Sequence, residues 1–552
     1  MGQKDMLETR LLSSLTKVFA DEELNDKPWN KGSMLSNEVY SLQVAYCWHG
    51  ELLKEVDVHI VSELSPYIKV RKVGLVPSEM PCYVDHDENI LRSTPGLYPD
   101  SLLPLDDEKL TFLPEQWRSI WITVDTCGSV VASTYPIEII FETASGEFLG
   151  KEIFELELLQ ARLPRQTLIQ TQWFHTDCLA TWYGVDVFSE EHWNLIDKFI
   201  KTATTHGINM ILTPIFTPPL DTEVGGERPT VQLVDVYKAG DAYRFEFDKL
   251  KRWIELCISN GVEYFEFSHL FTQWGAKHAP KIMAVEDGEY NHIFGWDTDA
   301  AGGEYKNFLD QFLPELINFI KENNLEQRSY FHVSDEPSLE HLDSYRNASN
   351  ILNKYLKDFP VIDALSNYQF YEDGLVKKPI PATDHIEAFL ENNVENLWAY
   401  YCCGQYKEVS NRFFNMPSAR NRILGIQLYK FNIEGFLQWG YNFWYSQYSR
   451  YSINPFCVTD AGYGFPSGDA FVVYPGKDGP LESLRLEVFY EAIQDLRALK
   501  LLEDLIGREA VLDLLEAGLD APITFSQYPK DMEWILSKRE QINRKIEECS
   551  KY

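Results

Sequence analysis

Two neighbouring carboxylic acids, Asp335 and Glu336, stand at the end of the mostly apolar, strand-like residues 329–334. Pro337 follows them and ends strand pairing there. Adjacent acids push each other's pKa values apart, so that one can donate a proton while the other stays charged. The pattern predicts acid–base chemistry by this pair. The alternative is that Ser334, Asp335 or a neighbouring serine caps a helix, because hydroxyls and acids favour helix N-termini.

Aromatic side chains recur near the ends of other strand-like segments of the same region. Phe, Trp and Tyr make up 14% of the chain, and flat aromatic rings suit a pocket that stacks hydroxylated ligands. One such residue is more often core than ligand contact, but repetition at successive strand ends favours a sugar-sized pocket around the two acids. The candidates for sugar contacts are Trp173, His175, Trp296, Tyr368, Trp398, Trp439 and Trp444.

The adjacency of the two acids restricts the chemistry further. Glycosidases that use two opposed carboxyls hold them about 5–5.5 Å apart for retention or about 6.5–9.5 Å apart for inversion. Side chains one residue apart serve one face of a sugar, which fits catalysis assisted by a 2-acetamido group on the substrate. Asp335 would then stabilise the acetamido group as it attacks the anomeric carbon. Glu336 would protonate the leaving oxygen and later activate water.

The elements that must position these residues fall into four parts. Residues 1–37 form a polar lead-in that we expect to be helical or loosely ordered. Residues 38–162 contain alternating strand patterns separated by Pro/Gly-rich loops, and a hairpin around Ser145 and Gly146, which predicts an antiparallel β-sandwich. Three aromatic residues of this part, Trp48, Trp117 and Trp121, are expected in its core and in its interface with the next domain.

In residues 163–502, apolar strands alternate with amphipathic helices in about eight units, which predicts a catalytic (β/α)8 TIM-like barrel. Catalytic groups of such barrels lie at the carboxyl ends of the strands. Residues 503–552 are charged and predict a helical C-terminal extension packed on the outside of the barrel. The fold class is therefore multidomain, with a β-sandwich, an α/β barrel and a helical tail.

Composition and motifs exclude several classes of protein. The net charge of −34 disfavours nucleic acid and anionic membrane surfaces as partners. No window of 18 apolar residues predicts a transmembrane segment. The chain lacks the motifs of nucleotide-binding proteins, zinc proteases and serine hydrolases. Nine cysteines without metal-binding spacing indicate reduced thiols, and residues 1–8 lack a signal pattern, so we expect a cytoplasmic protein, or a secreted one if a signal was removed.

Several sequence blocks together resemble glycoside hydrolase family 123. They are residues 173–180, 331–337, 398–404, 422–429, 435–444, 473–476 and 483–487. The resemblance implies a retaining exo-β-N-acetylgalactosaminidase that removes terminal β-linked N-acetylgalactosamine from a glycan or a glycosphingolipid headgroup. It implies no metal and no organic cofactor. The family's Asp–Glu pair falls on Asp335 and Glu336, and its tyrosine for the acetamido group falls on Tyr368.

Two alternatives stay open at the level of sequence. The first is a β-hexosaminidase or another retaining glycosidase with a different sugar, because no residue clearly reads the axial 4-hydroxyl; Asn442, His175 and Asp177 are candidates. The second is a non-catalytic glycan-binding protein with the sandwich as its lectin module, although both acids and the aromatic residues are kept. The sequence leaves the oligomeric state open.

Overall fold

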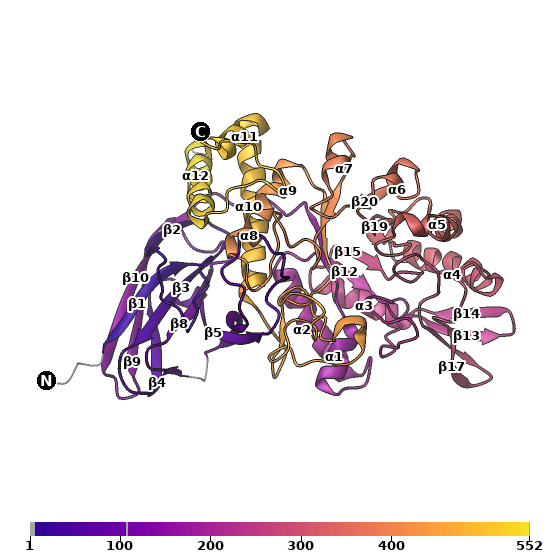
Figure 1. Cartoon of the computed structure of the whole chain (residues 1–552), viewed down its shortest axis with the longest axis horizontal. Coiled ribbons are helices and arrows are strands. Elements are labelled where there is room, and N and C mark those ends of the chain that lie inside the picture. The colour runs from indigo at the N-terminus through magenta and orange to yellow at the C-terminus, as the bar shows by residue number, and fades with distance from the viewer. Residues whose placement is uncertain (1–5, 106–108, 551–552) are drawn as a thin grey trace.

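A computed structural model describes residues 6–105 and 109–550. The chain begins in a β-rich part, continues through an α/β part and ends in long helices that lie between these two parts in the view of Figure 1. This is the predicted order of a β-sandwich, an α/β domain and a helical end. None of the helices in the described part of the chain is long and apolar enough to cross a membrane.

The β-rich part consists of two five-stranded sheets. Their pairings are antiparallel, apart from the parallel pair β2–β10. One sheet has the order β1 (Leu7–Ser13), β3 (Val39–Trp48), β8 (Trp117–Asp125), β5 (Ile68–Ser78), β6 (Gly96–Pro104), and the other β2 (Lys31–Leu35), β10 (Phe148–Leu159), β9 (Ser133–Thr143), β4 (Leu53–Val61), β7 (Leu110–Phe112). The predicted hairpin around Gly146 is confirmed, because β9 and β10 pair across it.

The expectation for residues 1–37 is wrong. Strand β1 pairs with β3, and β2 pairs with β10, so this segment supplies one strand to each sheet. The first half of β1 carries half-buried polar side chains such as Glu8 and Arg10, which hid the strand in the sequence. Trp48 is buried in the sandwich core, and the fully buried Trp121 belongs to the core shared with the α/β part, as predicted.

The α/β part is built on parallel strands. A six-stranded sheet has the order β18 (Ser329–Tyr330), β15 (Tyr264–Phe267), β12 (Met210–Thr213), β11 (Ile169–Gln172), β22 (Gly435–Gln438), β21 (Trp398–Tyr400). A separate parallel pair is formed by β19 (Ile362–Ala364) and β20 (Lys378–Ile380). Every residue of β11, β12 and β22 is buried, as expected for strands covered on both faces.

The predicted continuous eight-stranded barrel is only partly present as regular sheet. Single parallel bridges connect the two sheets: Phe331 with Val361 beyond β18, and Ala382 with Tyr400 of β21. Continuous ladders of hydrogen bonds therefore join six strands in one sheet and two strands in the other. Each of the two junctions between these sheets consists of a single bridge. The physical reason lies in the short strands of two to four residues, which leave little backbone to pair.

Helices follow the parallel strands along the chain. They are α1 (Thr176–Tyr183) and α2 (Glu190–Thr205) after β11, α3 (Asp248–Ser259) after β12, α4 (Gly303–Glu322) after β15, α5 (Leu342–Leu356) after β18, α6 (Gln369–Glu372) after β19, α7 (Glu387–Glu391) after β20, α8 (Ser418–Arg422) and α9 (Leu424–Lys430) after β21, and α10 (Leu484–Ile506) after β22. The Ser189 side chain caps α2 by accepting from the His192 amide.

A small sheet within the loops after β12 and β15 is absent from the sequence-based expectation. It has the order β14 (Ala242–Glu246), β13 (Asp235–Ala239), β16 (Ile282–Glu286), β17 (Glu289–Phe294). Its strands lie at the far end of the molecule from the sandwich (Figure 1).

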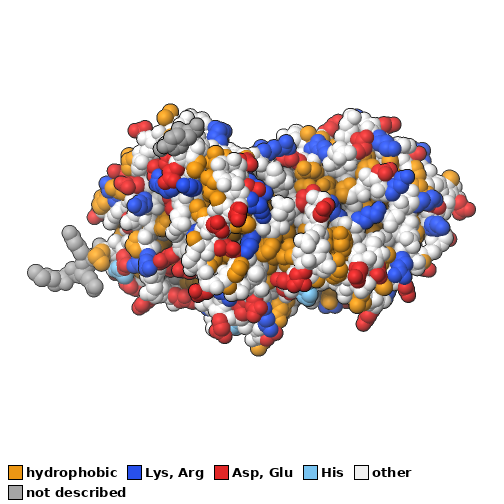
Figure 2. Space-filling model, turned by 90° about the horizontal axis from the view of Figure 1, so that it is seen from above, with side chains coloured by type: hydrophobic (Ala, Val, Ile, Leu, Met, Phe, Trp, Pro, Cys, Tyr) orange, Lys and Arg blue, Asp and Glu red, His pale blue; other side chains and the backbone are white. Residues whose placement is uncertain are grey.

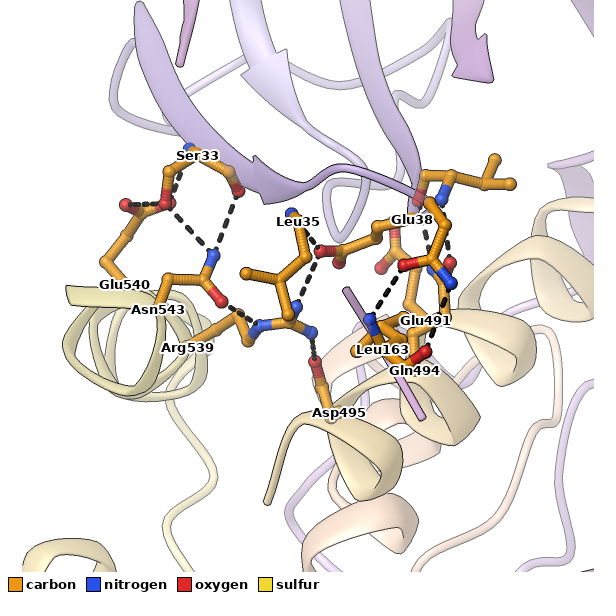
Figure 3. Close-up of polar contacts among 12 residues, drawn as sticks. Ser33, Leu35, Glu38, Leu163, Glu491, Gln494, Asp495, Arg539, Glu540 and Asn543 are labelled. Atoms are coloured by element: carbon orange, nitrogen blue, oxygen red, sulfur yellow. Dashed lines mark hydrogen bonds and ion pairs between the residues drawn. The ribbon is translucent and has the colours of Figure 1, made fainter. Parts of the chain in front are cut away.

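The C-terminal residues form α11 (Arg508–Glu516) and α12 (Met532–Ser550), as predicted for a helical extension. Helix α12 also contacts the sandwich: Glu540 accepts hydrogen bonds from the amide and hydroxyl of Ser33, and Asn543 donates to Ser33 (Figure 3). The tail therefore joins both domains rather than covering the α/β part alone.

The surface shows no segregation of charge on the face drawn in Figure 2. Acidic and basic side chains are interspersed there with hydrophobic ones, and no continuous basic patch is visible. This face offers no surface of the kind that binds a phosphate backbone.

Candidate active site

A pocket containing both predicted acids opens at the carboxyl ends of the parallel strands. It encloses about 760 Å³, its open mouth included. Its walls come from loops that follow most of the parallel strands, which explains why the residues are scattered in sequence. The lining side chains are Trp173, Leu220, Asp221, Gln273, Trp274, Asp335, Glu336, Ala364, Tyr400, Cys402, Cys403, Leu437, Trp439, Gln447, Tyr448 and Phe465.

Backbone hydrogen bonds from both neighbouring strands hold the acid pair in place. The Asp335 carbonyl accepts from the Trp274 amide at 3.0 Å, and the Glu336 amide donates to the Ala364 carbonyl at 3.1 Å. Glu336 has a left-handed backbone with φ of 43°. Strained backbone of this kind persists where surrounding contacts over-determine it, and it clusters at functional sites.

Both acids of the pair are half-buried, and their pKa values are displaced upward. Burial, followed by the neighbouring Glu336 carboxylate, raises the pKa of Asp335 well above its usual range. Burial also raises the pKa of Glu336. Two close carboxyls in a poorly solvated site resist losing the second proton, so the pair retains one proton at a higher pH than isolated acids would.

Tyr400, at the end of β21, holds the Glu336 carboxyl. Its hydroxyl donates to Glu336 Oε1 at 2.8 Å, which favours the ionised form and opposes the upward shift of the Glu336 pKa. The Cys402 thiol lies 4.0 Å from the same oxygen. Glu336 is therefore fixed by β18, β19 and β21 together.

A buried polar network lies beneath the acid pair. His332 hydrogen-bonds Asp363 through Nδ1 at 3.1 Å and Glu266 through Nε2 at 2.6 Å. Burial opposes a charge on His332, but these bonds outweigh it and raise its pKa to about 9. Glu266 also accepts from the Trp173 indole at 2.8 Å, so the same network orients a tryptophan of the pocket wall.

Asp363 supports the strand end that carries the acids. Its carboxylate accepts from the amides of Val333 and Ser334 and from the hydroxyl of Tyr345. These bonds replace ladder hydrogen bonds at a junction that has a single β-bridge. The carboxylate thereby fixes the backbone immediately before Asp335.

A second imidazole, His269, stacks on His332 with ring centroids 4.1 Å apart. Ligand atoms of His269, His332 and Asp363 lie within 4.8 Å of one another, a spacing that a metal ion could use. A cation there would have to displace a proton of His332 and its bond to Asp363. The arrangement suits a protonated imidazole between two carboxylates better than a metal ion.

The structure brings together only some of the residues singled out from the sequence. Trp173 and Trp439 line the pocket with the two acids. The Trp439 indole donates to Asp469, whose pKa burial raises to about 7. These two indoles are the part of the predicted aromatic wall that the pocket contains.

The three polar candidates for the 4-hydroxyl are engaged inside the protein. The Asn442 side chain accepts a hydrogen bond from the His175 amide and donates one to the His175 carbonyl. The ring of His175 contacts the Trp439 carbonyl and Arg228 at 2.9 and 3.2 Å, and burial lowers its pKa to about 3. Asp177 forms a buried two-point ion pair with Arg228 at 2.6 and 2.9 Å. None of the three lines the pocket as the described residues define it.

Four aromatic candidates also lie outside this pocket, which corrects the prediction. Trp398 is fully buried and pairs with Gly435, the first residue of β22, so it belongs to the opposite end of the strands. Trp444 is buried and donates to the Val473 carbonyl. Trp296 lines a neighbouring cavity and donates to the Gly226 carbonyl. The ring of Tyr368 packs on Phe389.

Comparisons with known proteins give the family to which the chain belongs. Residues 173–502 match the family model "Glycoside hydrolase 123, catalytic domain". No curated protein matches the chain significantly. Among solved structures, a family 123 glycoside hydrolase from Clostridium perfringens, described for its hydrolysis of glycolipid glycans, aligns with a TM-score of 0.77 and 16% identity over 99% of each chain.

Two further solved structures are far less similar. The β-glucuronidase of Parabacteroides merdae aligns with a TM-score of 0.30 and 12% identity over 90% of this chain and 52% of its own. A β-glucuronidase of Bacteroides uniformis aligns with a TM-score of 0.31 and 11% identity over 84% of this chain and 51% of its own. The family model matches more than half of the chain, including the acid pair and all lining residues of the pocket, which shows that the chain belongs to glycoside hydrolase family 123.

Proposed function

We propose that the protein is a retaining exo-β-N-acetylgalactosaminidase that acts by substrate-assisted catalysis. The observation that carries the proposal is the adjacent, half-buried pair Asp335 and Glu336, placed in a pocket with indole walls, where burial raises the pKa of both carboxyls. Adjacent acids reach the same side of a bound sugar, so the second face is left for the substrate's own acetamido oxygen.

In the first step, the acetamido carbonyl oxygen forms a bond to the anomeric carbon while the bond from that carbon to the leaving oxygen breaks. Glu336 gives its proton to the leaving oxygen, and Asp335 accepts a hydrogen bond from the acetamido N–H as positive charge develops there. In the second step, the oxygen of water bonds to the anomeric carbon of the oxazolinium ion, the bond from that carbon to the acetamido oxygen breaks, and Glu336 takes a proton from the water. Two displacements at one carbon retain its configuration.

The raised pKa values of the two carboxyls suit this division of roles. The acetamido N–H would stabilise the ionised form of Asp335 on binding, which leaves the proton on Glu336, where the leaving group needs it. The fixed bond from Tyr400 would then stabilise Glu336 once it has lost that proton. Substrate binding thus selects one protonation state of the coupled pair.

We propose a terminal β-linked N-acetylgalactosamine of a glycan or glycolipid headgroup as the substrate. The similar protein from Clostridium perfringens is described as acting on glycolipid glycans, which supports this class. Trp173, Trp274 and Trp439 offer aromatic surfaces on which a sugar ring can stack.

We further propose that the six-stranded and two-stranded sheets act as one (β/α)8 barrel joined at the two bridges.

The first test is hydrolysis of aryl β-N-acetylgalactosaminide beside the matching β-galactoside and β-N-acetylglucosaminide. Turnover of the first alone supports the proposed sugar and the need for its acetamido group. Turnover of the plain galactoside would refute substrate assistance. Preference for the glucosaminide would make the protein a hexosaminidase of different specificity, and binding of glycans without turnover would make it a glycan-binding protein.

Substitutions separate the roles of the two acids. Glu336→Gln should lower turnover of substrates with poor leaving groups by about 10²–10⁴-fold, because general acid catalysis contributes that much, and should spare activated aryl substrates in the first step. Asp335→Asn should slow the first step with every leaving group. Equal rescue of both variants by an activated leaving group would contradict this assignment.

A further inference from the structure

A third acidic side chain, Asp221, lines the pocket together with the catalytic pair. It lies in the loop after β12, and the pair follows β18. The strand between these two is β15, and its loop contributes Gln273 and Trp274 to the pocket. Because the Trp274 amide is bonded to Asp335, three successive strand ends form one continuous wall from the acids to Asp221.

Hydrogen bonds on several sides hold Asp221 in a strained conformation. Its amide donates to Gln273 Oε1 at 2.7 Å, its carbonyl accepts from the Ser449 hydroxyl at 2.7 Å, and its Oδ2 accepts from the Tyr448 amide at 2.9 Å. Its φ is 38°, in the left-handed region. Loops that hold a side chain in place despite backbone strain cluster at active sites and ligand-binding sites.

The remaining hydrogen-bonding capacity of this wall matches a hydroxyl group. Within the described residues, Asp221 Oδ1 receives no hydrogen bond and no Lys or Arg forms an ion pair with the carboxylate. Burial raises the pKa of Asp221 to about 6. Gln273 Nε2 beside it is a buried donor without a partner among the same residues. A sugar hydroxyl both donates and accepts, so it could satisfy an acceptor and a donor here.

We propose that Asp221, positioned by Gln273, accepts a hydrogen bond from a hydroxyl of the terminal sugar and sets the preference for the axial over the equatorial 4-hydroxyl. The inference rests on the proposed function, since it names a contact of the same pocket. The sequence candidates His175, Asp177 and Asn442 are all engaged elsewhere, which leaves Asp221 as the carboxylate on the wall away from the acid pair.

Asp221→Asn tests the role with little risk to the fold. Asparagine tolerates the left-handed region, and its side-chain oxygen can still accept from the Tyr448 amide. Loss of a hydrogen bond to a charged group should lower kcat/KM for aryl β-N-acetylgalactosaminide about 10- to 100-fold. The decrease in kcat/KM for the β-N-acetylglucosaminide should be smaller. The ratio of the kcat/KM values for the two substrates should therefore move towards one. The matched control is Asp297→Asn, which removes an exposed acid from the neighbouring cavity and should change neither value.

A binding measurement keeps this inference separate from the proposed reaction. Free N-acetylgalactosamine and N-acetylglucosamine can be titrated against the fluorescence of the pocket tryptophans. Absence of turnover by the wild type would refute the proposed function, yet a loss of affinity in Asp221→Asn that is larger for N-acetylgalactosamine would still support the role of Asp221. Unchanged affinity, an equal loss for both sugars, or no binding of either sugar to the wild type would overturn it.

Discussion

At the scale of single residues, the pocket concentrates strained backbone. Asp221, Trp274, Glu336 and Tyr448 all line it, and all have positive φ values without being glycine. Each such residue costs about 1–3 kcal/mol, which the surrounding structure must offset. Hydrogen bonds of their amides provide the restraint: Tyr448 donates to the Asp221 carboxylate, and Trp274 and Glu336 donate to carbonyls of neighbouring strand ends. The pocket is therefore held in one shape before substrate arrives. Fixed donors and charges of this kind need no rearrangement during the reaction.

Tyr400→Phe tests how the catalytic acid is held. The lost hydroxyl stabilises the ionised form of Glu336, so the variant should raise the pKa of Glu336 and move the alkaline limb of the pH–rate profile to higher pH. Turnover should fall about tenfold, the value of a hydrogen bond to a charged group. The measurement is the dependence of kcat/KM on pH.

The adjacent tyrosine provides the control for that variant. Tyr401 is also buried, and its hydroxyl has no hydrogen-bond partner within the described part of the chain. Tyr401→Phe should leave the profile unchanged. If both variants gave the wild-type profile, Tyr400 would have no influence on the acid.

At the scale of elements, the close packing of α9 on α10 positions the last parallel strand. Gly425 of α9 faces the α10 backbone, where an added Cβ would lie 2.0 Å from the Ala492 carbonyl oxygen. Only a glycine permits this approach. Helix α9 leads directly into β22, which ends just before Trp439 of the pocket. The spacing of two helices thereby affects the position of a sugar-stacking side chain.

Gly425→Ala should therefore destabilise the protein by about 1–3 kcal/mol or more, because the clash is with backbone that cannot rotate away. Chemical denaturation followed by circular dichroism measures this. Gly303→Ala is the matched control: it begins α4, and no atom lies within 4 Å of the added Cβ. Equal stability of the two variants would show that α9 and α10 can separate at no cost.

At the scale of the whole molecule, buried ion pairs bind the sandwich to the α/β part through α10. Arg485 pairs with Asp100 of β6, and Arg71 of β5 pairs with Glu487. A second group joins Glu38 of the sandwich, Asp495 of α10 and Arg539 of α12 (Figure 3). If one domain unfolded alone, it would leave the charges of its partner in these pairs uncompensated, which is strongly destabilising. We therefore expect the two domains to unfold together.

Glu491 makes this interface sensitive to pH. It accepts from Arg422 at 2.8 Å and from Ser14, but burial outweighs these contacts and raises its pKa from 4.5 to about 7. Between these two values the unfolded chain loses the proton while the folded protein keeps it. The contribution of this group to stability is thus full below about pH 4.5 and is lost as the pH rises through 7.

Glu491→Gln should remove that loss. Relative to the wild type, the variant should gain up to about 3 kcal/mol between pH 4.5 and pH 8, because each pKa unit corresponds to about 1.4 kcal/mol. Denaturant unfolding across this pH range measures the difference. Glu509→Gln, an exposed change on α11, serves as the control and should show no such trend. A constant difference between Glu491→Gln and wild type at all pH values would contradict the proposed titration.

The sequence by itself determined the features that depend on neighbours along the chain. Alternating residues marked the strands of the sandwich, and an apolar run ending in Asp335, Glu336 and Pro337 marked a strand end. Trp173 and Trp439 were found for the same reason, since each directly follows a parallel strand. Strand β1 was missed because half-buried polar residues interrupt its apolar pattern.

Tertiary structure decided which side chains enter the pocket. Trp398 and Tyr400 belong to one short strand, but its register pairs Trp398 with the first residue of β22 and places Tyr400 beside Glu336. Asp177 is a candidate sugar contact in the sequence, yet Arg228 from a distant loop forms an ion pair with it. Asp221 gave no local signal, because its wall is formed by the ends of β12, β15 and β18, which are far apart along the chain. A side chain's role is set by partners that folding brings to it, and spacing along the chain does not record them.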